Sequence, residues 1–321
     1  MEIGKRIGLA YGPATRDAFG ETLRELGRER PNLVVLDGDV ANSTRTEYFA
    51  HEFPERFFNV GIAESNMIGV AGGLAASGKE VVAASFAVFL LCNAYDQIRM
   101  SIAFPGLPVH LVGSHSGISI GEDGPSQMAI EDIALAGSLP GFTVLVPADG
   151  PAARALTRQM MDVAGPTYLR VGRSKVPQIY DGEADLTIGR AQRLRDGDDV
   201  TLVACGLMVA AALEAVDVLS GEGIDARVLD MHTVKPVDVQ ALEAAARETG
   251  AIVTAEEHLL DGGLGSIVAR AVAERHPVPM AFVGLQNRYA ESGDPQGLLD
   301  KYGLTATHIA AAARNLLRHR S

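Results

Sequence analysis

VVAASFAVFLLCNAYDQIRMSIAFPGLPVHLV, residues 81–112, contains two short apolar runs separated by a longer amphipathic segment. The runs at 81–84 and 109–112 have the composition of buried strands, and residues 93–103 have the spacing of a helix. A strand, a helix and a second strand in this order predict two parallel strands joined by a crossover helix. The same alternation extends along the chain in both directions.

The first half of the chain repeats this pattern several times. Further strands are predicted at residues 33–36, 143–146 and 168–171, and further helices near 16–28, 64–76 and 152–163. Asp149, which follows the strand ending in Val146-Pro147, is a candidate N-cap of the next helix.

A change of composition divides the chain. Residues 175–199, KVPQIYDGEADLTIGRAQRLRDGDD, are polar and rich in turn formers, with a short strand expected near Ile188. The alternation then resumes, with strands predicted at 200–204, 226–230, 251–255 and 280–283 and helices at 209–219, 239–248, 264–273 and near 309–317. We therefore predict two doubly wound α/β domains, 1–180 and 190–321, the second smaller and built on a mostly parallel sheet.

Composition excludes several classes of partner. The formal net charge of −12 argues against nucleic acid or an anionic membrane surface. No apolar run approaches the ~20 residues of a membrane span. The N-terminal MEIGKRIGLAYG has no apolar signal core, so a cytoplasmic location is expected. Cys92 and Cys205 are too few for a disulfide framework, and both are expected in the core.

Three further motifs carry candidate functional residues. The loop HSGISIGEDGPSQMAIE, residues 115–131, combines a histidine, acidic residues and several glycines. Such a loop favours close approach of a ligand over a plain surface turn. Glu64 lies in NVGIAESNM, where a loop at 57–63 leads into an apolar helix, so it either serves the helix dipole or a buried site. Phe86 and Phe89 follow the strand at 81–84, where they either fill the core or stack on a flat ligand.

Together these motifs resemble those of transketolases, whose central domain carries an HDS-GEDGPTH loop. VLDMHTVKPVD (228–238) and TAEEHLLDGGLG (254–265) resemble the transketolase C-terminal domain. The resemblance implies that the first domain binds the pyrimidine of thiamine diphosphate. Glu64 would activate this cofactor, because a carboxyl group in an apolar pocket favours its protonated form. Phe86 and Phe89 would hold the pyrimidine, and Asp39 would lie near it.

The same resemblance implies a site for a sugar phosphate. Arg16, Ser43, His115 and Arg173 would surround the phosphate, since paired arginines recognise a dianion bidentately. Asp123 and Gln127 would contact substrate hydroxyls, and Glu64, His115 and Gln127 form the implied catalytic set. Gln127 replaces the commoner histidine and cannot act as a cation or general acid.

Three positions leave alternatives open. The third stacking aromatic of the family falls at Cys92, with Tyr95 slightly further on. The glycines at 262, 263 and 265 either bind an anion at a helix N-terminus or pack against a neighbouring subunit. His258 is expected to be structural.

The metal-binding half of a transketolase site does not appear in the sequence. Transketolases hold magnesium through a GDG motif followed by an asparagine some 25–30 residues later. The nearest strings, residues 37–40 (DGDV) and 196–199 (DGDD), do not match this pattern. The resemblance therefore implies a Mg²⁺ or Ca²⁺ site on a separate N-terminal transketolase subunit, with an α2β2 assembly.

The implied activity is that of a split transketolase, which transfers a two-carbon ketol unit between sugar phosphates of the pentose phosphate pathway. Four alternatives remain open: the β-subunit of a 2-oxoacid dehydrogenase, a chain like deoxyxylulose-phosphate synthase, a ketol transferase of a specialised pathway, and a decayed subunit that only scaffolds its partner. The arginine and histidine set favours a phosphorylated substrate.

Overall fold

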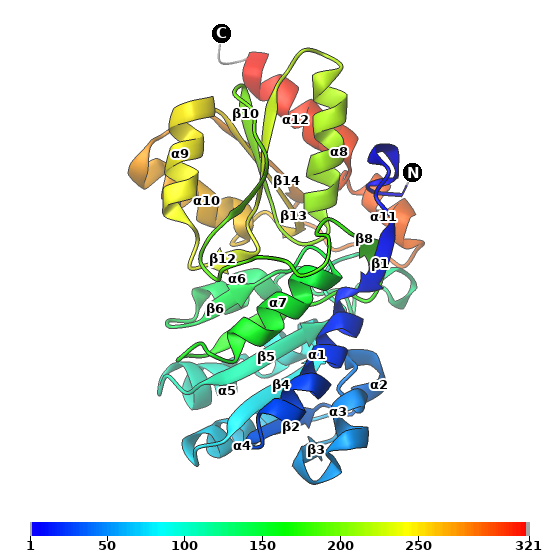
Figure 1. Cartoon of the computed structure of the whole chain (residues 1–321), viewed down its shortest axis with the longest axis vertical. Coiled ribbons are helices and arrows are strands. Elements are labelled where there is room, and N and C mark those ends of the chain that lie inside the picture. Colours follow the sequence, from blue (N-terminus) through cyan, green and yellow to red (C-terminus); the bar gives the residue numbers. More distant parts are fainter. Residues whose placement is uncertain (1, 319–321) are drawn as a thin grey trace.

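A largely parallel sheet forms the core of the first lobe of the computed structural model, which describes residues 2–318 (Figure 1). Within that range the sheet has seven strands in the order β12-β6-β7-β5-β4-β2-β3. Their bounds are β2 Leu33–Asp37, β3 Phe57–Asn59, β4 Glu80–Phe86, β5 Val109–Ser114, β6 Thr143–Leu145, β7 Thr167–Arg170 and β12 Thr233–Lys235. All neighbouring pairs are parallel except β12 with β6.

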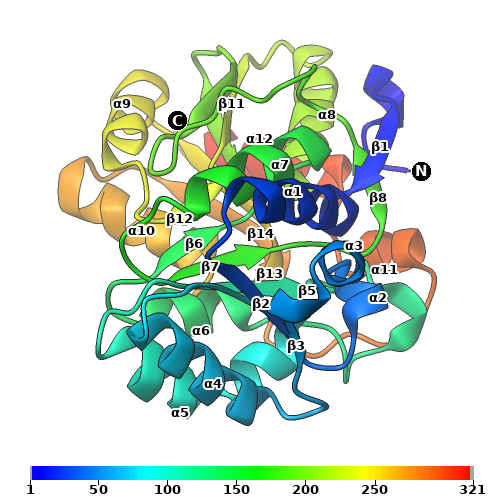
Figure 2. The ribbon, with the colours of Figure 1, turned by 60° about the horizontal axis from the view of Figure 1, so that its bottom comes forward.

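Helices cover both faces of this sheet (Figure 2). One face packs against α1 (Thr15–Glu29), α3 (Glu47–Glu52) and α7 (Gly150–Met160). The other packs against α4 (Glu64–Ala76), α5 (Tyr95–Ile98) and α6 (Asp132–Ser138). The short helix α2 (Ala41–Thr44) follows β2. Because both faces are covered, the central strands are continuous apolar runs, the pattern expected of a buried parallel sheet.

The second lobe is built on a smaller sheet. Among the described residues it has five strands in the order β14-β13-β10-β11-β9, with β9 antiparallel to β11 and the rest parallel. The strands are β9 Gln192–Arg195, β10 Val200–Ala204, β11 Ala226–Asp230, β13 Ile252–Leu259 and β14 Met280–Leu285. A separate antiparallel pair joins β1 (Tyr11–Ala14) to β8 (Lys175–Pro177).

The two lobes share apolar packing. Helices α8 (Met208–Ser220) and α12 (Ala306–Arg318) pack on one face of the second sheet, and α9 (Val239–Thr249) and α10 (Leu264–Arg275) on the other. The cluster that holds α9 and α10 continues without a break into the core beneath α4 and α6. Helix α11 (Pro295–Lys301) lies beside the junction, near β1 and β8 (Figure 1).

Most of the predicted elements are confirmed, with small differences at their ends. The helix at 64–76 and the strands at 200–204 and 226–230 begin and end as expected. Asp149 caps α7, since its Oδ1 accepts a hydrogen bond from the Ala152 amide at 2.9 Å. The α/β fold class, with mostly parallel sheets, is as predicted.

Several local predictions are wrong. No strand forms at Ile188, whose amide instead donates to Gln159 Oε1 on α7; β9 begins four residues later. The expected loop at 57–63 begins as the strand β3. The helix expected at 93–103 does form from Tyr95 to Ala103, but only α5 is α-helical; π-helical turns at Phe89–Asn93 and Arg99–Ala103 flank it. Cys205 is buried, but Cys92 is exposed, and its neighbours Leu90 and Leu91 are the residues of the turn Phe89–Asn93 that fill the core.

Strand β12 was not anticipated. It belongs to the later part of the chain, yet it pairs with β6 at the edge of the first sheet. The predicted domain limits, 1–180 and 190–321, stay predictions. Separately, no helix within residues 2–318 has both the length and the apolar character needed to cross a membrane.

Candidate active site

The candidate residues gather at one edge of the first sheet. Asp39 follows β2, Phe86 ends β4, His115 follows β5 and Arg173 lies beyond β7. These strands are parallel, so their carboxyl ends meet at the same edge. Ligands of open α/β sheets bind at this edge.

Glu64 is buried at the first residue of α4, with 5% of its surface exposed. Ser85 Oγ, from β4, donates a hydrogen bond to Glu64 Oε1 at 2.9 Å. Gly38 lies against both groups, and a Cβ there would stand 3.0 Å from Ser85 Oγ. One carboxylate oxygen is therefore held by the protein, in a position fixed by a helix and a strand.

Asp39 directly follows Gly38, the residue that lies against this carboxyl group. Its backbone is left-handed, with φ of 66°, and its side chain is exposed. Asn59 Nδ2, from the end of β3, donates to Asp39 Oδ1 at 2.6 Å. Asp39, the second acidic residue at this edge of the sheet, is thus bonded to the segment that precedes Glu64.

The two phenylalanines form a parallel pair. The ring centroids of Phe86 and Phe89 are 6.0 Å apart, with 10° between the ring planes. The imidazole of His115 stacks on Phe86 at 3.9 Å and 15°. His115 therefore contacts both the aromatic pair and, through its other side, the arginine cluster described next. Tyr95, a candidate third aromatic, pairs its hydroxyl with Ser138 Oγ at 2.6 Å.

Arg16 joins two of the candidate residues directly. Its Nη1 donates to the backbone carbonyl of Ser43 at 2.9 Å and lies 3.3 Å from His115 Nε2. The contact to Ser43 uses the main chain, so the hydroxyl predicted to bind phosphate has no bond to the arginine. The buried Nε of Arg16 has no hydrogen-bond partner among the described residues. A buried charged donor without a partner is a group that a ligand can satisfy.

The electrostatics of His115 follow from its neighbours. Burial, together with the charges of Arg16, Arg173 and Arg45, lowers its pKa to about 3. A guanidinium can only donate, so Nε2 accepts and Nδ1 carries the proton, which it donates to Ser114 Oγ at 2.8 Å. Burial and the charges of Arg45 and Arg173 also lower the pKa of Arg16. Several cations thus face one another around a neutral imidazole.

The far side of the site is formed by the glycine-rich loop. Arg173 Nη1 donates to the Ile120 carbonyl at 3.0 Å and forms an ion pair with Asp123 at 3.3 Å. Arg173, expected to bind the phosphate, and Asp123, expected to contact the sugar hydroxyls, are therefore paired with each other. Gln127 accepts a hydrogen bond from Ser126 Oγ. No hydrogen bond joins Gln127 to the other candidate residues in the described part of the chain.

Sequence reasoning missed Arg45. Its Nε donates to Asp17 Oδ1 at 2.6 Å and its Nη1 to the Asn42 carbonyl at 2.6 Å, next to the carbonyl that Arg16 binds. Its φ is 69°, and its backbone passes so close to α1 that a Cβ on Gly20 would lie 2.4 Å from its Cβ. The available signal was that Arg45 lies only two residues after Ser43, which was already a candidate residue.

The glycines at 262–265 have a partner within the chain. Glu256 accepts hydrogen bonds from the amides of Leu264 at 2.6 Å and Gly265 at 2.8 Å. An intramolecular carboxylate thus occupies the N-terminus of α10, where an external anion was one expectation. Burial raises the pKa of Glu256 to about 7. His258, fully buried, contacts the Leu259 carbonyl and the Ala134 amide, as a structural residue would.

Across residues 2–318, no group of three or more His, Cys, Asp or Glu side chains is placed to hold a metal ion.

Comparison with known families agrees with this geometry. Residues 12–178 match the family described as "Transketolase, pyrimidine binding domain". Residues 189–309 match "Transketolase, C-terminal domain". The two lobes, each built on its own sheet, thus correspond to two domains of a known class of α/β transferase. The chain belongs to the transketolase family.

Individual relatives of similar length support this assignment. The chain is 41% identical to a "Putative transketolase C-terminal section" of Methanocaldococcus jannaschii, covering 92% of this chain and 93% of that protein. It is 40% identical to a "6-deoxy-6-sulfo-D-fructose transketolase subunit" of Clostridium sp. (strain MSTE9), covering 95% of each. A solved structure described as "Split gene transketolase, inactive beta4 tetramer" is 48% identical, with a TM-score of 0.89, over 96% of this chain and 99% of that one.

Proposed function

We propose that this chain is the C-terminal subunit of a split transketolase, which transfers a two-carbon ketol unit from a ketose phosphate to an aldose phosphate. The contact of His115 with Phe86 on one side and Arg16 on the other carries the proposal. Through His115 the arginine cluster adjoins Phe86, and Glu64 binds Ser85, the residue before Phe86. A phosphorylated sugar needs an anion site for its phosphate as well as a pocket for its reacting end.

The residues fit thiamine diphosphate as the cofactor. Only Oε1 of Glu64 takes part in the hydrogen bond with Ser85, so its other oxygen can hold a ring nitrogen of the pyrimidine. The parallel rings of Phe86 and Phe89 suit a flat heterocycle. When bound, thiamine diphosphate supplies a carbon nucleophile for making and breaking the bond beside the ketose carbonyl. Asp39 would complete the polar side of this pocket.

The remaining candidate residues would bind and orient the sugar. Arg16, Arg173 and the neutral His115 would take the phosphate, with Ser43 at its edge. Binding of the phosphate to Arg173 would release Asp123 from its ion pair, so that Asp123 could face the sugar hydroxyls. Gln127 would contact a hydroxyl as a hydrogen-bonding amide, and the acid–base work would fall to Glu64 and His115.

A partner subunit would supply the rest of the site. This chain lacks the expected metal motif, so Mg²⁺ or Ca²⁺ and the diphosphate group would be held by an N-terminal transketolase subunit, in an α2β2 assembly in the cytoplasm. Exposed apolar side chains around α4 support such a partner: Ile62 is 84% exposed, and Phe104, which follows the turn Arg99–Ala103 packed on α4, is 82% exposed. Surfaces of this kind are typical of subunit contacts.

The identity of the sugar has two candidates. Sugar phosphates of the pentose phosphate pathway are the default substrates. A sulfonated ketose is the second, because a relative 40% identical over nearly the whole chain is described as a 6-deoxy-6-sulfo-D-fructose transketolase subunit. A 2-oxoacid, the substrate of the related dehydrogenase β-subunits, carries no phosphate for the cluster of Arg16, His115 and Arg173.

The test is ketol transfer from xylulose 5-phosphate to ribose 5-phosphate, with thiamine diphosphate and magnesium. This chain, its presumed partner and the mixture of both are assayed in parallel, and the sulfonated ketose replaces xylulose 5-phosphate in a second series. We expect activity in the mixture alone. Turnover by the isolated chain would contradict the split site, and turnover of a 2-oxoacid alone would contradict the phosphate assignment.

A further inference from the structure

The glycine-rich loop is held by the second lobe as well as by the sheet from which it emerges. Ile118, Ile120, Met128 and Ile130 are buried in the apolar cluster around α8 and α12. The Leu259 amide donates to the Ile130 carbonyl at 3.0 Å. The loop that carries His115 and Asp123 is therefore packed largely on C-terminal residues.

One buried carboxylate makes the central contact. Glu257, on β13 and 6% exposed, accepts a hydrogen bond from the Ser119 amide at 2.6 Å. Gly117 lies against the same carboxylate, with φ of 79°, and a Cβ there would stand 2.3 Å from Glu257 Cδ. A glycine is required at this position because the carboxylate occupies the space of a side chain.

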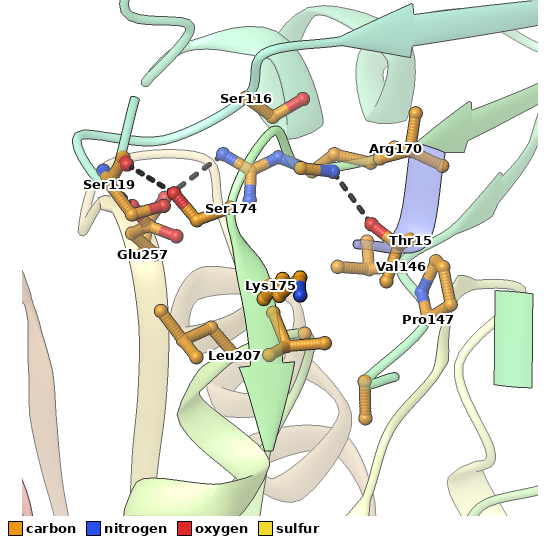
Figure 3. Close-up of a pocket in the computed structure, with 15 residues that line it drawn as sticks. Thr15, Ser116, Ser119, Val146, Pro147, Arg170, Ser174, Lys175, Leu207 and Glu257 are labelled. Atoms are coloured by element: carbon orange, nitrogen blue, oxygen red, sulfur yellow. Dashed lines mark hydrogen bonds between the residues drawn. The ribbon is translucent and has the colours of Figure 1, made fainter. Parts of the chain in front are cut away.

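The peptide that Glu257 holds is also bound to the candidate phosphate-binding segment. Ser174 Oγ donates to the Ser119 carbonyl at 3.0 Å, and the preceding Arg173 donates to the carbonyl of Ile120. Figure 3 shows Ser119 beside Glu257 and Ser174. A shift of Ser119 would thus move the carbonyls that orient Arg173, and with them its ion pair with Asp123.

Arg170, the last residue of β7, binds the main chain of Glu257 itself. Arg170 Nη2 donates to the Glu257 carbonyl at 3.0 Å and to the Ala129 carbonyl at 3.1 Å, and Arg170 Nε pairs with Asp132 at 2.7 Å. These contacts join β7, the far end of the loop and β13, and Figure 3 shows Arg170 and Glu257. Burial raises the pKa of the Glu257 carboxyl group, and the charge of Arg170 opposes that shift.

We infer that Glu257 is a positioning residue for substrate recognition, and that the C-terminal lobe holds the glycine-rich loop in its anion-binding conformation through it. The residue acts through Ser119 on Arg173 and Asp123, without touching the substrate. This inference rests on the proposed function, because it assigns the loop a role in binding the sugar phosphate.

Two variants and a matched control test the inference. Glu257→Ala removes the acceptor of the Ser119 amide, and Glu257→Gln retains one. A cavity of about 50 Å³ beside Glu257 gives the new amide nitrogen room. The control is Glu256→Ala, because Glu256 lies on the same strand and is also buried but binds the N-terminus of α10.

The decisive measurement is amide hydrogen exchange of residues 116–128 in the full isolated chain, followed by titration with inorganic phosphate. We expect Glu257→Ala to raise exchange of these amides about tenfold or more and to weaken phosphate binding, with Glu257→Gln close to wild type. Exchange that is unchanged in Glu257→Ala, or raised equally by Glu256→Ala, would overturn the inference.

Kinetics of the assembled enzyme separate this inference from the proposed function. Glu257→Ala should raise KM for the ketose phosphate more than it lowers kcat, which a general loss of stability would not do. If the wild-type mixture shows no ketol transfer, the proposed function fails, and the exchange of the loop still decides the role of Glu257.

Discussion

Replacing Arg16 with leucine should separate the anion site from the rest of the active site. The guanidinium binds the Ser43 carbonyl and His115 Nε2, and its buried Nε has no partner within the described residues. Each hydrogen bond from a charged group is worth about 1.5–3 kcal/mol. The loss of one such contact with a phosphate should lower kcat/KM roughly 10- to 150-fold, mainly through KM.

The assay is ketol transfer by the assembled enzyme over a range of ketose phosphate concentrations. The matched control is Arg28→Leu, which removes an arginine from the same helix whose guanidinium is exposed and bound to Glu52. An Arg16→Leu enzyme whose KM stays within twofold of the Arg28→Leu enzyme would refute the assignment of Arg16 to the phosphate.

The same variant tests the electrostatics of His115. Its pKa of about 3 is lowered first by burial and then by Arg16. With Arg16 gone, the pKa should rise toward the ordinary value of about 6.5 but remain below it, because burial and Arg173 still disfavour the charged form. An NMR titration of the imidazole measures this shift. A pKa that does not move would show that the two side chains do not interact in solution.

Three further predictions concern single groups. Glu64→Gln should lower kcat of the assembled enzyme by at least about 100-fold with little change in unfolding temperature, because the amide cannot exchange a proton with the cofactor; activity near wild type would remove Glu64 from the catalytic set. Gly117→Ala should destabilise the chain by about 2–5 kcal/mol in urea unfolding, from a left-handed φ and a clash with the neighbouring carboxylate. Gly182→Ala, which has a positive φ of 68° but open space around it, should lose only about 1–2 kcal/mol, and equal losses would exclude the clash. Because the pKa of Glu256 is raised to about 7 from an ordinary 4.5, the folded state binds more protons than the unfolded state between those values. Glu256 therefore contributes about 3 kcal/mol to the free energy of unfolding at low pH, and this contribution is lost as pH rises from 4.5 to 7. The free energy of unfolding of a Glu256→Gln chain should vary correspondingly less with pH.

The periodicity of the chain was enough to predict the fold class. Apolar runs such as residues 200–204 and 226–230 lie at the centre of parallel sheets, where burial on both faces requires a continuous apolar sequence. Edge elements carry no such requirement. β12 and β9 are short and partly polar, and they are strands only because a neighbouring edge offers free backbone groups.

The sequence by itself determined which residue types stand at the carboxyl ends of the strands. Their positions at or after the ends of β2, β4, β5 and β7 follow from local strand and turn signals, so Asp39, Phe86, His115 and Arg173 could be expected at one edge. Tertiary structure alone decided which of these groups meet. The stacking of His115 on Phe86 and the use of the Ser43 carbonyl by Arg16 depend on side-chain directions that no spacing encodes.

The same limit applies to the C-terminal lobe. Its EEH motif could be seen in the sequence, but not that Glu256 and Glu257 point to opposite partners. Successive side chains of a strand face opposite sides of the sheet, so one carboxylate caps α10 and the next binds the glycine-rich loop. Which segment lies on each side is settled by long-range packing, since 138 residues of chain separate Ser119 from Glu257.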